Sequence, residues 1–67
     1  MIIEAVPRLL TTAEAAEVLR VSMSFLMKAR LKGDGPRYRK LGRAVRYTEP
    51  DLHNYVKQQA RTSTSES

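Results

Sequence analysis

The side chains of this sequence that could act on a partner are mainly arginines and lysines, and most of them fall in one stretch. Eight of the twelve basic residues lie between Lys28 and Arg46, where Asp34 is the only acidic residue. The chain has a formal net charge of +5. A cluster of one sign of charge in a basic chain favours an anionic partner, either a nucleic acid or an acidic membrane surface.

Other kinds of chemistry have little support in the sequence. The chain has no cysteine and a single histidine, His53, which we expect to be an exposed helix residue and not a metal ligand. Ser22 and Ser24 have no histidine nearby to act as a base, so neither is a candidate nucleophile. We therefore predict a protein that is not an enzyme, with no catalytic residue, metal, cofactor or small-molecule ligand.

The basic stretch itself has the pattern of a β-hairpin. Gly42-Arg43 suits a two-residue type II′ turn, because glycine tolerates a positive φ at the first position. A turn there pairs Arg39 with Arg46, and it also predicts the pairs Leu41 with Ala44, Lys40 with Val45, and Tyr38 with Tyr47. Opposed arginines repel each other. The hairpin therefore either offers this face to a polyanion or exposes it to solvent as an ordinary strand surface.

Two helices are expected before this hairpin. Thr11 and Glu14 have the spacing of a capping box, which predicts a helix over residues 12–19. Ser22 is a suitable N-cap for a second helix over residues 23–31, and Gly33 suits the left-handed position that ends it. The short segment between them predicts a tight turn.

A third helix is expected over residues 49–59, with Thr48 as its N-cap. Its apolar face would hold Leu52, Tyr55, Val56 and Gln59, which recur at helical spacing. We expect Leu26 in the core, together with Tyr38, Tyr47 and Tyr55. Met23 and Met27 suit either the core or an outer face, and Phe25 would pack against the hairpin or against a protein partner.

Sixty-seven residues allow a single domain, which we assign to residues 1–61, followed by a disordered polar tail at residues 62–67. The first residues lack the pattern of a signal peptide, and no apolar run approaches the ~20 residues of a membrane span. We therefore expect a cytoplasmic protein that does not act on a membrane.

Two helices joined by a tight turn, then a basic hairpin and a helix, predict a winged helix-turn-helix: mainly α, with a small two-stranded hairpin as the wing. A helix fits the major groove of DNA, and a hairpin reaches an adjacent minor groove or phosphate row. At residues 9–56, LLTTAEAAEVLRVSMSFLMKAR followed by GDGPRYRKLGRAVRYTEPDLHNYV resembles the excisionase and phage-regulator family, small relatives of the MerR-type DNA-binding domain.

The resemblance implies roles for individual residues. The groove-facing side of the second helix would present Ser22, Met23, Ser24, Met27 and Lys28, and the hairpin would present Arg43 at its tip and Arg46 on its basic face. Thr11 and Thr12 would bring a helix N-terminus near a phosphate. The predicted DNA-binding set is completed by Arg30, Arg39 and Lys40. Met23 and Phe25 stand where Arg and Thr are common in the family, so we expect modest sequence specificity, with more weight on phosphate contacts and DNA shape.

The function implied is that of an excisionase, a recombination directionality factor that binds cooperatively to adjacent sites, bends DNA and promotes integrase-mediated excision of a phage or prophage. The expected partners are double-stranded DNA, further copies of the chain and a phage integrase. Only a polar tail follows the third helix, so we expect assembly on DNA and not a preformed dimer. The alternatives are a small phage or prophage transcriptional regulator of the same fold and, with less support, a protein-interaction adaptor for an integrase.

Overall fold

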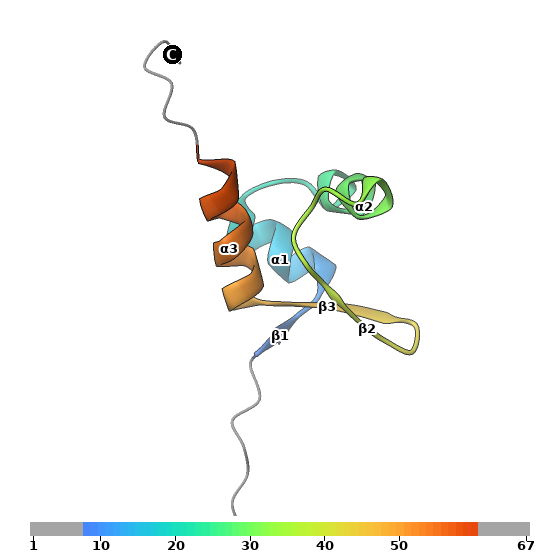
Figure 1. Cartoon of the computed structure of the whole chain (residues 1–67). Helices are drawn as coiled ribbons and strands as arrows, with labels where there is room; N and C mark the ends of the chain where they lie inside the picture. Colours follow the sequence, from blue (N-terminus) through green and yellow to red (C-terminus); the bar gives the residue numbers. More distant parts are fainter. Residues whose placement is uncertain (1–7, 61–67) are drawn as a thin grey trace, which may run out of the picture.

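A computed structural model describes residues 8–60, which form three helices and a small sheet (Figure 1). The elements in chain order are β1 (Leu9–Leu10), α1 (Thr12–Leu19), α2 (Met23–Lys32), β2 (Arg39–Leu41), β3 (Ala44–Thr48) and α3 (Glu49–Gln59). This arrangement confirms the predicted winged helix-turn-helix. None of the described helices is long and apolar enough to cross a bilayer.

The sheet has three strands and not the two that were predicted. Its order is β1-β3-β2, with both pairings antiparallel. Leu10 pairs with Tyr47, and Leu9 pairs with Thr48. The first strand has only two residues, which is too short to show the alternation that identifies a strand in a sequence. Its effect is to hold β3 from the side opposite the hairpin.

The helix boundaries follow from the capping residues. Thr11 Oγ1 accepts a hydrogen bond from the Glu14 backbone N–H, and Glu14 Oε1 accepts one from the Thr11 N–H, which completes the predicted capping box. Ser22 caps α2, and Thr48 caps α3. Gly33 ends α2 at φ +78°, so α2 runs one residue further than predicted.

The core lies where α1, the start of α3 and one face of the sheet meet α2. Its buried apolar side chains are Leu10, Ala15, Ala16, Leu26, Tyr47 and Leu52. The two alanines are small, so α1 can approach its neighbours closely. Val45 packs against this cluster from the wing, which makes its side of the hairpin the inner face.

Part of the predicted core is exposed. On α3, Leu52 is buried, but Val56 is 53% exposed and Gln59 is also exposed. The second half of α3 extends past the sheet (Figure 1), so the strands do not cover it. Tyr38 is exposed as well, while Tyr47 is buried and Tyr55 is half-buried. The end of the domain at residue 61 and the predicted tail at residues 62–67 lie outside the described residues.

Candidate nucleic-acid interface

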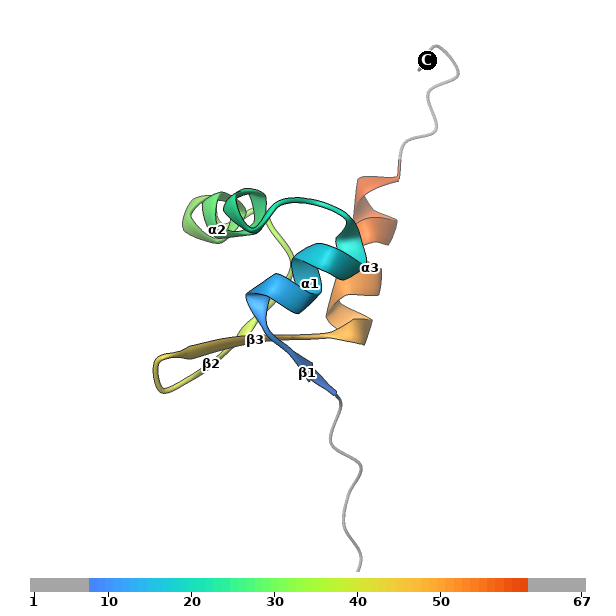
Figure 2. The same ribbon diagram turned by 180° about the vertical axis from the view of Figure 1, so that it is seen from behind.

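The second helix and the hairpin extend to the same side of the molecule. In Figures 1 and 2, which show opposite faces, α2 and the β2–β3 hairpin project together away from α3. A protruding helix beside a protruding hairpin is the arrangement with which a winged helix-turn-helix spans adjacent grooves of a duplex.

The two sides of α2 differ in burial. Leu26 and Ala29 face the core, whereas Ser24 and Lys28 lie on the opposite side of the helix and are exposed. Met23 and Met27 are each 46% exposed, so neither is a core residue. Ser22 is also exposed, and its hydroxyl oxygen accepts a hydrogen bond from the Phe25 N–H. The outer side of α2 thus carries few polar side chains, and apolar side chains lie beside them.

Phe25 lies on a different side of α2 from the wing. Together with Tyr55 and Gln59 of α3, it lines a depression of about 410 Å³ between the two helices. The prediction that Phe25 packs against the hairpin is therefore wrong, because the helical turn directs it toward α3. Its ring remains 45% exposed.

The hairpin has the predicted turn and register. Arg39 pairs with Arg46, Lys40 with Val45, and Leu41 with Ala44. Gly42 has φ +64°, and Arg43 is not among the positive-φ residues, as a type II′ turn requires. Tyr38 precedes the ladder, although its ring centroid lies 6.3 Å from that of Tyr47.

The basic side chains of the hairpin differ in their surroundings. Arg43 and Lys40 are exposed at and near the tip, and no ion pair involves either of them among residues 8–60. Arg46 is half-buried and donates a hydrogen bond from Nη1 to the Val45 carbonyl oxygen, at 2.9 Å. The tip is therefore the part of the wing whose charge is most available to a polyanion.

Arg39 is paired within the protein. Its Nη2 lies 3.4 Å from Oδ2 of Asp51, whose side chain is only 12% exposed. The same carboxylate oxygen accepts a hydrogen bond from Thr48 Oγ1 at 2.9 Å. The positive charge on the outer face of the hairpin is thus partly neutralised at the base of the hairpin. This explains how the fold tolerates Arg39 opposite Arg46.

Arg30 also contacts the wing. Its Nη1 donates a hydrogen bond of 2.9 Å to Tyr47 Oη, and its guanidinium carbon lies 5.6 Å from the centre of the Tyr38 ring. Sequence spacing gives no signal for this contact, because the two hydrogen-bonded residues are 17 positions apart. The contact from Asp51 to Arg39 was missed for the same reason.

The start of α1 already holds an anionic group of its own. Glu14 accepts the Thr11 N–H, so this donor is not free for a phosphate, while the side chains of Thr11 and Thr12 are half-buried. The interface built by the most exposed predicted residues therefore centres on α2 and the hairpin tip, and α1 lies at its margin.

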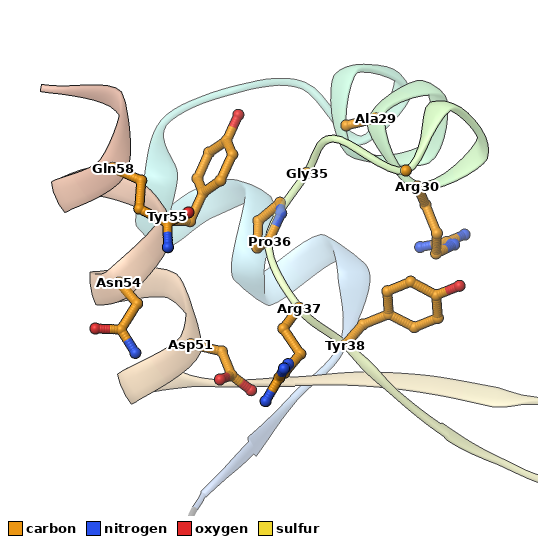
Figure 3. Close-up of a pocket in the computed structure, with 11 residues that line it drawn as sticks. Ala29, Arg30, Gly35, Pro36, Arg37, Tyr38, Asp51, Asn54, Tyr55 and Gln58 are labelled. Carbon is orange, nitrogen blue, oxygen red and sulfur yellow. The ribbon is translucent and has the colours of Figure 1, made fainter. Parts of the chain in front are cut away.

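A larger depression of about 540 Å³ separates the loop after α2 from α3 (Figure 3). Its polar lining includes Arg37, Asp51, Asn54 and Gln58, with Tyr55 beside them. These side chains contain no nucleophile with an adjacent base. Within residues 8–60, no three histidine, cysteine, aspartate or glutamate side chains gather closely enough to hold a metal ion.

One comparison with known proteins bears on this surface. The family model described as a helix-turn-helix domain matches residues 9–60, which is most of the chain and contains every element of the structure. No curated protein matches the chain.

Proposed function

The chain belongs to the helix-turn-helix domain family, which supports binding to double-stranded DNA, and we propose that it is an excisionase that loads onto adjacent DNA sites and promotes integrase-mediated excision. The family includes excisionase-like small DNA-binding proteins. The observation that carries the proposal is the shared projection of α2 and the basic hairpin from one side of a very small domain (Figures 1 and 2).

In the proposed complex, α2 enters the major groove with Ser24 and Lys28 toward the DNA. The Ser22 and Ser24 hydroxyls and the Lys28 ammonium supply its polar contacts, while Met23 and Met27 supply apolar ones, for example to thymine methyl groups. Arg43 reaches the neighbouring minor groove or its phosphates from the wing tip, with Lys40 and Arg46 behind it. Thr11 and Thr12 would approach a phosphate only at the margin.

This distribution of groups implies modest sequence specificity. Base-edge hydrogen bonds give most direct readout, and the exposed side of α2 has few side chains that form them. Affinity would come mainly from phosphates and DNA shape. A binding assay that found more than about a 10⁵-fold preference for one site over random duplex would contradict this, since that is well inside the strongly specific range.

A single module of this size on one site would bind weakly at physiological salt. Copies arranged head to tail on adjacent sites would restore affinity through contacts between neighbours, and such a heterologous arrangement extends without closing. Each copy that draws a minor groove toward its wing would also bend the duplex. Gel shifts should then show a ladder of complexes, and sedimentation of the free protein at micromolar concentration should show a monomer. A stable free dimer would contradict the assembly.

The test of the excisionase proposal is a recombination assay on the DNA that flanks the gene. Purified chain added to the neighbouring integrase and attachment sites should raise excision, and the R43A variant should raise it less. The second candidate, a transcriptional regulator, rests on the same DNA-binding surface. A protein that changes expression from an adjacent promoter but leaves excision unchanged would favour that candidate and exclude the first.

A further inference from the structure

The base of the wing is joined to α2 through one guanidinium group. Arg30 lies next to the buried side of α2, one residue after Ala29, and it is half-buried. Its Nη1 donates to Tyr47 Oη, and its planar group lies over the ring of Tyr38. In Figure 3 the guanidinium extends from α2 toward the Tyr38 ring.

The two tyrosines belong to the two arms of the hairpin. Tyr47 is in β3 and is buried, whereas Tyr38 lies immediately before β2. Their ring centroids are 6.3 Å apart, and the rings are tilted by 52°. A single cation on α2 therefore contacts both arms at the point where the hairpin leaves the domain. A hairpin alone is marginally stable in water, so its direction depends on such contacts.

We propose that Arg30 is a positioning residue that fixes the wing relative to α2, and that it does not contact a DNA phosphate. The hydrogen bond to Tyr47 uses a charged donor, and the contact with Tyr38 is a cation–π interaction, both of which hold a guanidinium in place. This role rests on the proposed DNA-binding mode, because the spacing between helix and wing matters only if both engage the duplex.

The first test measures wing position without DNA. The chain has no cysteine, so spin labels can be placed at L31C in α2 and L41C in β2, two positions that are 88% and 54% exposed. The distance distribution between the labels should be narrow in the parent protein. It should become broader or displaced in R30M and in Y47F, which removes only the hydroxyl group. R43M, at the wing tip, should leave it unchanged. Identical distributions in all four proteins would overturn the proposal.

The second test measures DNA affinity as a function of salt, at a temperature where circular dichroism shows every variant folded. R30M and Y47F should each weaken binding by roughly tenfold, the change expected for a hydrogen bond to a charged group. The double variant should be about as weak as R30M alone, because both substitutions break the same contact. Y47F should not change the slope of log affinity against log salt, because it removes no charge.

The slope of log affinity against log salt distinguishes a positioning role of Arg30 from a direct phosphate contact. R43M should reduce the magnitude of the slope by about 1, as expected for a lost phosphate contact. R30M should reduce it by clearly less. A reduction equal to that of R43M, with an effect that adds fully to that of Y47F, would show a phosphate contact and overturn the proposal. If the parent protein did not bind DNA at all, the proposed function would fail, while the spin-label result would still test the contact between Arg30 and the wing.

Discussion

Arg39 Nη2 lies 3.4 Å from Asp51 Oδ2, so a cation of the wing's first strand is paired with a carboxylate in the first turn of α3. That carboxylate also accepts the Thr48 hydroxyl, which places one acidic group at the junction of wing and helix. The charge of the hairpin is therefore divided: its base is held by the protein, and its tip is open to a polyanion.

This division predicts different effects for two substitutions that remove the same charge. R43Q should weaken DNA binding and reduce the magnitude of the salt slope by about 1, because an exposed phosphate contact is lost. R39Q should change the slope less, because Asp51 already neutralises Arg39. Fluorescence anisotropy across a salt series measures both values. K57Q, an equal change of charge on exposed α3, is the control and should have little effect. Equal slopes for R39Q and R43Q would contradict the division.

A substitution at Gly35 tests the contact between α2 and the loop that joins α2 to β2. A Cβ at Gly35 would lie 2.7 Å from the Cβ of Ala29, so the loop or the helix would have to move. G35A should lower the free energy of unfolding by about 1 to 3 kcal/mol, the usual cost of overpacking. Urea denaturation measures it. G35A should lower the free energy of unfolding by less in a protein that already carries A29G than in the parent protein, because A29G removes the opposing methyl group. Fully additive effects would show that the two residues do not press on each other.

Replacing Arg20 with glycine should stabilise the protein. Arg20 ends α1 in the left-handed region at φ 60°, and it is the one non-glycine residue in residues 8–60 with positive φ. R20G should raise the free energy of unfolding by about 0.5 to 1 kcal/mol, because glycine adopts this conformation without the Cβ clash. R20A removes the same charge but keeps the Cβ, so it should give no gain. Thermal unfolding of the two variants compares them directly, and a gain of the same size in R20A would assign the effect to charge.

Leu26 and Met27 are neighbours on α2 with opposite surroundings. Leu26 is fully buried, so L26A should cost about 2 to 5 kcal/mol, a large part of the stability of so small a domain. Met27 is 46% exposed, and M27A should change stability by about 0.5 kcal/mol or less. Circular dichroism at increasing urea reports both. A large loss in M27A would place that methionine in the core.

Local signals in the sequence were enough to predict the three helices and the wing. Thr11, Ser22 and Thr48 each form the predicted cap, and Gly42 gives the hairpin its turn, because these features depend on neighbouring residues only. The predictions that failed depend on distant parts of the chain. Strand β1 exists because β3 passes beside Leu9 and Leu10, and Val56 is exposed because the second half of α3 extends past the sheet.

Contacts between distant residues also limited the prediction of the candidate site. Sequence patterns identified Lys28, Lys40 and Arg43, which are exposed on α2 or the hairpin, as candidate contacts. They could not distinguish these cations from Arg30 and Arg39, which contact the protein itself. That distinction needs the three-dimensional packing of α2 and α3 against the hairpin, since the partners are distant in the sequence.

We expect α2 and the wing tip to bind DNA as one surface. The most direct measurement is a titration of the isotopically labelled protein with a short duplex at low salt, followed by amide chemical shifts in NMR spectra. The amides of Ser24, Lys28, Gly42 and Arg43 should shift together along one binding curve, while those of His53 and Lys57 on α3 remain in place. Shifts concentrated on α3, with an unperturbed wing tip, would contradict it.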